Sequence, residues 1–73
     1  MNNLFILSVN DRAIGVYTSH MKAVQAAIMD TLPFSYTLTD YSYELGVEFY
    51  TFTDKSYTEK IYSIQEVTPD TRV

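Results

Sequence analysis

The stretch that decides the fold runs from Phe34 to Asp54 and reads FSYTLTDYSYELGVEFYTFTD. Aromatic and β-branched residues dominate it, as suits pleated strands, and Leu45-Gly46 is its only turn signal. We therefore predict a β-hairpin. A three-residue loop Glu44-Leu45-Gly46, with Gly46 in the left-handed conformation, would place Tyr43 opposite Val47 and Tyr41 opposite Phe49.

This register divides the side chains of the hairpin between two faces, because alternate residues of a strand point to opposite sides. The first face would carry Ser35, Thr37, Thr39, Tyr41, Tyr43, Val47, Phe49, Thr51 and Thr53. The second face would carry Phe34, Tyr36, Leu38, Asp40, Ser42, Glu48, Tyr50, Phe52 and Asp54. We expect the root of the second face to pack under a helix and the distal part of the first face to remain exposed.

Three further strands are expected around this hairpin. Leu4 to Val9 is a nearly continuous apolar run, which favours an interior strand, and Ala13 to Tyr17 follows it after a polar turn at Asn10-Asp11-Arg12. Gly15 weakens the second strand, so we expect a bulge or a close approach of the helix backbone there. After a turn at Asp54-Lys55-Ser56, Tyr57 to Val67 predicts the last strand, whose imperfect alternation indicates a bulge or contact on both sides.

The helix is predicted from His20 to Leu32, because a hydroxyl of Thr18-Ser19 can cap its first turn and Pro33 ends it. Its apolar stripe would consist of Val24, Ile28 and Leu32, with Met21, Ala23 and Ala27 alongside. The predicted fold class is α+β: a single antiparallel sheet of about five strands with one helix packed on one face, in the order β-β-α-β-β-β.

Length and composition indicate one soluble domain, residues 1–73, with residues 68–73 as a frayed polar tail. The absence of cysteine excludes disulfides, a thiolate nucleophile and a cysteine zinc site. No segment approaches the roughly 18 apolar residues of a spanning helix, and the start of the chain lacks the basic residues of a signal peptide. We expect a cytoplasmic protein without membrane contact, cofactor or metal.

Acidic residues concentrate in the middle of the chain. The net charge is −4, which disfavours direct nucleic-acid binding because affinity for phosphates comes from Lys and Arg. No basic residue lies between Lys22 and Lys55, whereas the acidic residues Asp30, Asp40, Glu44, Glu48 and Asp54 all do. A solubility bias is one explanation, and a surface complementary to a basic partner is the other.

The predicted interaction site lies at the distal end of the hairpin. Tyr41, Tyr43, Val47 and Phe49 would form an apolar surface rimmed by Asp40, Glu44 and Glu48. Burial of each such apolar side chain is worth roughly 1.5–3 kcal/mol, so four of them left in water would indicate that another molecule covers them. Tyrosine suits protein recognition, whereas base stacking would need cationic side chains that this segment lacks.

No residue is assigned a catalytic role. His20, the only histidine, is expected at the start of the helix in a structural or solvent-facing role. No phosphate-binding loop is present, and the serines lack a base. Asp40, Glu44 and Glu48 could form acid-base pairs or bind Mg²⁺, which would make a small hydrolase or nuclease, but a convex hairpin tip is too well hydrated for either role.

The segment Ala13-Ile14-Gly15-Val16-Tyr17-Thr18-Ser19, followed by Ala23 and Ala26-Ala27, resembles the strand-to-helix junction of several families of very small phage and bacterial proteins of unknown function. Tyr62 to Val67 is similar to their closing strand. The resemblance covers about half of the chain, does not include the Phe34–Asp54 hairpin, and implies a small α+β unit that is phage-encoded.

These observations lead to two functional hypotheses. The first is a non-enzymatic protein-binding module, a phage-encoded inhibitor of a host defence or nucleic-acid-processing protein, that binds a basic host surface in the host cytoplasm. Nucleic-acid mimicry is its strong version, which the modest charge and the nearby Lys55 and Lys60 disfavour. The second is a small homodimeric structural or regulatory domain that pairs with a second copy through exposed sheet faces.

Overall fold

The computed structural model describes residues 3–31 and 36–68. Its elements are β1 (Leu4–Val9), β2 (Arg12–Tyr17), α1 (His20–Thr31), β3 (Thr37–Glu44), β4 (Val47–Thr53) and β5 (Glu59–Val67). The predicted order and α+β class are confirmed. The predicted helix end at Leu32-Pro33, the hairpin residues Phe34 and Ser35, and the tail beyond Thr68 lie outside the described residues.

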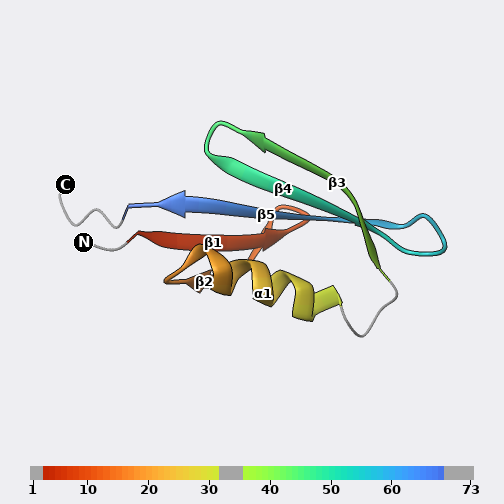
Figure 1. Cartoon of the computed structure of the whole chain (residues 1–73), viewed down its shortest axis with the longest axis horizontal. Helices are drawn as coiled ribbons and strands as arrows, with labels where there is room; N and C mark the ends of the chain where they lie inside the picture. Colours follow the sequence, from red (N-terminus) through yellow and green to blue (C-terminus); the bar gives the residue numbers. More distant parts are fainter. Residues whose placement is uncertain (1–2, 32–35, 69–73) are drawn as a thin grey trace.

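The five strands form one antiparallel sheet in the order β2-β1-β5-β4-β3 (Figure 1). The last strand in the sequence is therefore the middle strand of the sheet, with the β1–β2 hairpin on one side and the β3–β4 hairpin on the other. The pairing of β5 with both neighbours runs without a register shift. The expected bulge is therefore absent from β5. Tyr62 and Ile64 are buried on the helix side, Ile61 is 41% exposed on the opposite face, and Tyr57 lies outside the strand.

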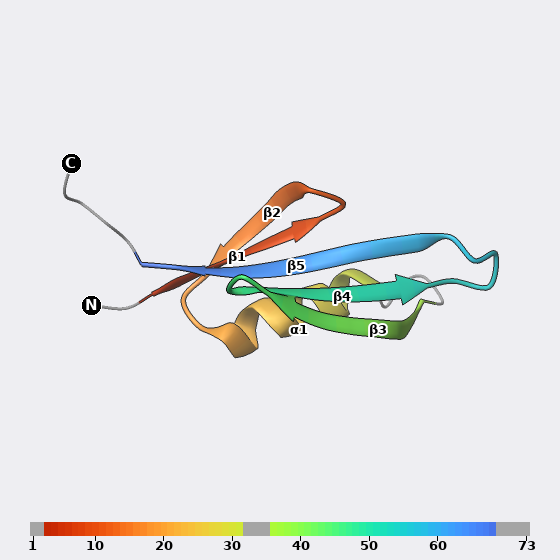
Figure 2. The ribbon, with the colours of Figure 1, turned by 90° about the horizontal axis from the view of Figure 1, so that it is seen from above.

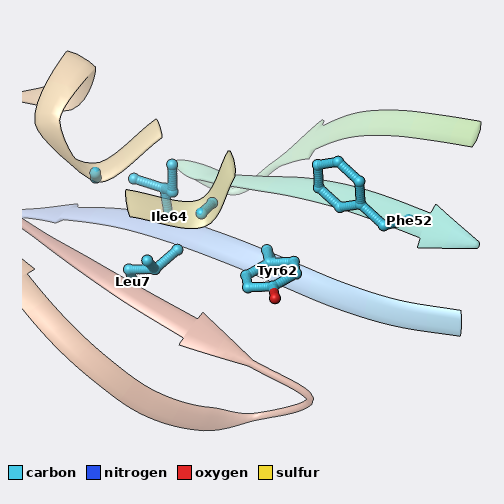
Figure 3. Close-up of a cluster of buried hydrophobic side chains, with 6 residues drawn as sticks. Leu7, Phe52, Tyr62 and Ile64 are labelled. Atoms are coloured by element: carbon cyan, nitrogen blue, oxygen red, sulfur yellow. The ribbon is translucent and has the colours of Figure 1, made fainter. Parts of the chain in front are cut away.

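Helix α1 lies on one side of the sheet and contacts β1, β2 and β5 (Figures 1 and 2). We call the sheet face on the helix side the helix-side face and the opposite one the open face. The core between the helix and the sheet contains Leu7, Ala23, Ala27, Phe52, Tyr62 and Ile64 (Figure 3). No helix in the described part of the chain covers the open face.

Fewer residues of α1 are buried against the sheet than the predicted apolar stripe contained. Ala23 and Ala27 are buried, whereas Ile28 is 46% exposed and Val24 is half-buried. The alanines leave little bulk between the helix and the sheet, so the larger side chains lie at its flanks. A groove of about 280 Å³ between α1 and the second hairpin is lined by Val24, Ala27, Ile28, Leu38, Tyr50 and Phe52.

Ser19 caps the first turn of α1, as predicted. Its Oγ accepts a hydrogen bond from the backbone N–H of Lys22 (3.1 Å), and its carbonyl accepts one from Ala23 (3.2 Å). The bond to Oγ satisfies an amide that the helix itself leaves unpaired, and the bond to the carbonyl is the first backbone bond of the helix. The helix is 12 residues long, and no described helix is long and apolar enough to cross a membrane.

Two-residue turns close both hairpins. Asn10 and Asp11 have φ values of 49° and 68°, and Val9 pairs with Arg12. Leu45 and Gly46 have φ values of 52° and 80°, and Glu44 pairs with Val47. Positive φ at both central residues is typical of turns that match the twist of the strands. The predicted three-residue loop Glu44-Leu45-Gly46 is therefore wrong, and Leu45 takes a conformation that was expected for Gly46 alone.

Bulges interrupt both edge strands. Leu7 pairs with Gly15 and Ser8 with Ala13, which leaves Ile14 as the extra residue of β2. The predicted bulge near Gly15 is thus confirmed, but the close neighbour of Gly15 is not the helix backbone. A Cβ atom on Gly15 would lie 2.6 Å from the Tyr17 hydroxyl, so glycine makes room for that ring. In β3 the register shifts at Thr39, between Leu38 and Asp40.

The loop between β4 and β5 is organised by Asp54. Its Oδ1 accepts hydrogen bonds from the backbone N–H groups of Ser56 and Thr58, each 2.8 Å long. Tyr57, between them, has a φ of 63°. The predicted turn is confirmed, and it extends two residues further than expected because Tyr57 and Thr58 belong to the loop and β5 begins at Glu59.

Candidate interaction surface on the second hairpin

The observed register divides the seven predicted site residues between the two faces. Tyr43 lies opposite Glu48, and Tyr41 lies opposite Tyr50. Phe49 lies opposite Ser42 instead of Tyr41. Because a shift of one residue moves a side chain to the other face, the single predicted surface does not exist. Tyr41, Tyr43 and Glu48 lie on the helix-side face, whereas Asp40, Glu44, Val47 and Phe49 lie on the open face.

Glu48 is the centre of a polar cluster on the helix-side face. The Tyr41 hydroxyl donates to its Oε2 over 2.7 Å, and the Nε2 of His20 pairs with its Oε1. The Tyr41 and Tyr50 rings also lie 5.0 Å apart between centroids. Two partners therefore hold the carboxylate in place, one from the edge strand β3 and one from the first turn of α1.

The ionisation of this cluster follows from its contacts. Partial burial alone would raise the pKa of the Glu48 carboxyl, but hydrogen bonds from Tyr41 and His20 favour the charged form and bring the pKa below its usual 4.5. The hydrogen bond to Glu48 raises the pKa of Tyr41 to about 12. Partial burial, followed by the Glu48 charge, also raises the pKa of Tyr50. The cluster therefore carries a carboxylate and neutral tyrosines at neutral pH.

His20 belongs to this site and was not predicted to do so. The sequence separates it from Glu48 by 28 residues, and their proximity depends on the register of the hairpin. The Phe5 ring lies edge-on to the imidazole, with 5.9 Å between centroids. His20 thus links the start of α1 to the hairpin. A hollow of about 270 Å³ beside it is lined by Phe5, His20, Tyr43, Gly46, Glu48, Ile64 and Glu66, none of which is a serine or threonine nucleophile.

The acid pairs considered for catalysis do not form. Glu44 and Glu48 lie on opposite faces of the hairpin. Asp40 and Glu44 share a face but are four residues apart on one strand, which separates them by roughly 13 Å along it. Carboxylates at that distance neither share a proton nor bind one metal ion. Among the described residues, no three histidine, aspartate or glutamate side chains gather into a metal site.

The open face is aliphatic and rich in small polar residues. Ile6, Val16, Val47, Phe49 and Ile61 lie on it, interspersed with Ser8, Ser42, Thr51, Ser63 and Gln65. Val16 is 58% exposed and Ile61 is 41% exposed. No tyrosine from a strand lies on this face. The tyrosine-rich surface and the surface without a helix are therefore different surfaces.

The edge strand β3 is the most exposed element. All eight of its residues are exposed, and Tyr43 is 64% exposed. Leu45, at the tip, is fully exposed in a left-handed conformation that costs L-residues roughly 1–2 kcal/mol. The hairpin tip therefore combines an exposed apolar side chain with a costly backbone conformation.

Comparisons with protein-family models, curated proteins and solved structures found no match to this chain.

Proposed function

We propose that this chain is a non-enzymatic protein-binding module whose β3–β4 hairpin binds a basic surface of another protein. The proposal rests on one observation: this hairpin combines negative charge with an exposed edge strand. It has the carboxylates of Asp40, Glu44 and Glu48 and no basic residue. Tyrosines anchor protein interfaces because they supply large contact areas with a polar tip.

The contacts of Glu48 support this role. Its carboxylate remains charged because Tyr41 and His20 hold it, and Tyr41 is itself 48% exposed. Asp40 and Glu44 lie on β3, as Tyr41 does, and are exposed on the opposite face of that strand. A basic partner therefore meets negative charge from either face of the hairpin, which favours fast and specific association.

A narrower form of the proposal identifies the chain as a phage-encoded inhibitor of a host defence or nucleic-acid-processing protein, acting in the host cytoplasm. Its support is the resemblance of the Ala13–Ser19 junction to small phage proteins, together with the basic surfaces that nucleic-acid-processing proteins present.

The proposal is tested by affinity capture from an extract of the cells in which the chain occurs, with the wild type and Tyr43→Ala and Glu44→Lys variants as baits. We expect basic proteins to be retained by the wild type and lost from both variants. With a purified retained protein, Glu44→Lys should slow association at about 20 mM salt and have little effect at about 500 mM, where charges are screened. Equal binding by all three baits under both conditions would refute the site.

The open face supports a second candidate function, a homodimeric structural or regulatory domain. Val16 and Ile61 are exposed there beside Ile6, Val47 and Phe49, and burial against a second copy would remove these apolar side chains from water. Light scattering distinguishes the candidates. A dimer has twice the 8.4 kDa mass of the chain and is weakened by Phe49→Ala, whereas a concentration-independent monomer refutes dimerisation.

A further inference from the structure

The outer side of β3 is a free sheet edge. In the described part of the chain β4 is the only strand beside it. The opposite edge, β2, is different, because α1 packs on it and Ile14 bulges from its centre. The bulge of β3 lies at Thr39, so the segment Asp40–Glu44 after it pairs regularly with β4. This segment is about 17 Å long, the length of an average strand.

The backbone of this segment has groups available for pairing. In an antiparallel hairpin with a two-residue turn, the residues that flank the turn exchange both hydrogen bonds, and every second pair does the same. Glu44, Ser42 and Asp40 therefore bond to β4, while the N–H and C=O groups of Tyr41 and Tyr43 point away from it. Edge strands are commonly protected by charged side chains, proline or a bulge. Asp40–Glu44 contains no proline or bulge, and its two carboxylates repel an acidic strand but attract a cationic one.

The side chains of the segment define what can pair with it. Asp40, Ser42 and Glu44 lie on the open face, and Tyr41 and Tyr43 lie on the helix-side face. A strand added at this edge would alternate in the same way. Its residues on the open face would be cationic, to match the carboxylates, and those on the helix-side face would be apolar, to pack beside the tyrosine rings.

A second copy of the chain is a poor occupant of this edge. The symmetric antiparallel register that pairs the whole Asp40–Glu44 segment joins Tyr41 of one copy to Tyr43 of the other and centres on Ser42. It would place Asp40 opposite Glu44 twice, with the side chains of each pair close together. Like charges directly opposite one another destabilise a sheet. The edge therefore favours a foreign, basic strand.

We infer that β3 accepts, as a sixth strand, an extended segment of another protein with lysine or arginine at alternate positions. The inference rests on the proposed function and specifies its partner. The hydrogen bonds would come from the Tyr41 and Tyr43 backbone, which provides affinity, and the alternating charges would determine which segments bind.

Three synthetic peptides test the inference. All have the sequence Thr-Lys-Val-Lys-Val-Lys-Thr with blocked ends: one is unmodified, one carries N-methyl groups on both valine amides, and one carries them on two lysine amides. With lysines facing Asp40 and Glu44, the valines lie opposite Tyr41 and Tyr43 in hydrogen-bonded pairs. Valine methylation therefore removes the bonds to β3, while lysine methylation affects amides that point away from it.

NMR titration and amide hydrogen exchange provide the readouts. We expect the unmodified and lysine-methylated peptides to bind within twofold of each other and to slow exchange at the Tyr41 and Tyr43 amides at least tenfold. The valine-methylated peptide should bind at least tenfold more weakly. Equal binding of all three peptides without slowed exchange would overturn the edge inference and leave the proposed function standing, because charge alone would then explain the affinity.

Two protein variants separate the backbone of β3 from its side chains. Tyr43→Ala retains the outward N–H, whereas Tyr43→Pro removes it at a position where an edge strand tolerates proline. We expect the unmodified peptide to bind Tyr43→Pro at least fivefold more weakly than Tyr43→Ala, with both variants folded by circular dichroism. Equal affinities, or no binding of the unmodified peptide to the wild type, would overturn the inference, while the capture experiment independently decides the proposed function.

Discussion

The two hairpins of this protein have similar backbones and different surroundings. Both are antiparallel pairs closed by two residues with positive φ. The first, β1–β2, lies beside α1 and contributes the fully buried Leu7 to the core. The second, β3–β4, is joined to the rest of the sheet through β5, and its outer strand is exposed along its whole length.

Their turns show the same difference. Asn10 and Asp11 are residues that adopt the left-handed conformation readily, whereas Leu45 is not. The turn of the first hairpin is thus built from residues suited to its conformation, and α1 covers one face of this hairpin. The second retains an exposed leucine at its tip and two exposed tyrosines on its edge, a combination that suits contact with another molecule better than stability.

The largest expected effect is on the covered hairpin. Leu7→Ala removes a fully buried side chain and should lower the free energy of unfolding by about 3 kcal/mol, a large fraction of the stability of a domain of this size. Leu38→Ala, on the second hairpin, is the control. Leu38 is 48% exposed, so its loss should cost less than about 1 kcal/mol in urea denaturation. Equal costs would contradict the contrast between the hairpins.

The two faces of the second hairpin should differ in partner binding. Tyr43→Ala should raise the partner Kd about tenfold, or ~1.4 kcal/mol, since the ring lies on the proposed docking edge. Phe49→Ala, on the open face of the neighbouring strand, should change Kd less than about threefold. Surface plasmon resonance with the captured partner measures both variants. A larger effect of Phe49→Ala than of Tyr43→Ala would show that the partner contacts the open face instead.

The turns can be compared by changing Leu45 to the residue type that the first hairpin uses. Leu45→Asn should raise the free energy of unfolding by about 1 kcal/mol, because asparagine adopts positive φ at lower cost. Leu45→Ala, which removes the side chain but keeps the conformational cost, should leave stability nearly unchanged. Thermal unfolding followed by circular dichroism distinguishes them, and a loss of stability in Leu45→Asn would contradict the assigned strain.

The smallest expected effect concerns Glu48, which links the second hairpin to α1. The folded pKa of Glu48 lies below its unfolded value, so its contribution to stability is complete above about pH 4.5 and is lost as the pH falls through the folded pKa. Glu48→Gln should therefore be less stable than the wild type at pH 7, with a difference that shrinks toward pH 3.

Asp40→Asn serves as the matched control for this substitution. It changes an exposed carboxylate on the other face of the same hairpin. At pH 7 it should cost less stability than Glu48→Gln, because Glu48 is held by Tyr41 and His20. A pH-independent difference between Glu48→Gln and the wild type would show that the Tyr41 and His20 contacts do not stabilise the carboxylate.

The fold was largely predictable from the sequence because its signals are local. The apolar run Leu4–Val9, the cap at Ser19 and the aromatic segment around Leu45-Gly46 each indicate their element without reference to the rest of the chain. The buried side of the helix was less predictable. The helix lies close to the sheet, so the small Ala23 and Ala27 are buried and the larger Ile28 is not. The periodicity of the apolar residues does not show how closely the helix approaches the sheet.

The candidate site was only partly predictable because it depends on a register set by single residues. Leucine is unfavourable at positive φ, so the sequence favoured a loop in which Gly46 alone has positive φ. The register predicted from that loop placed Val47 and Phe49 on the same face as Tyr41 and Tyr43. The seven predicted residues were expected on one face and lie on two. The contact between His20 and Glu48 could not be predicted, since it exists only in the observed register.

The central position of β5 also has a consequence for how the protein is made. Leu4 pairs with Val67, and in the described part of the chain the two hairpins are joined through β5, which follows both of them in the sequence. Until β5 has been synthesised, the two hairpins have no shared strand. Such pairing across the whole chain slows folding. A stop codon before Glu59 would therefore release two unjoined hairpins, which proteases would degrade, instead of a shortened domain.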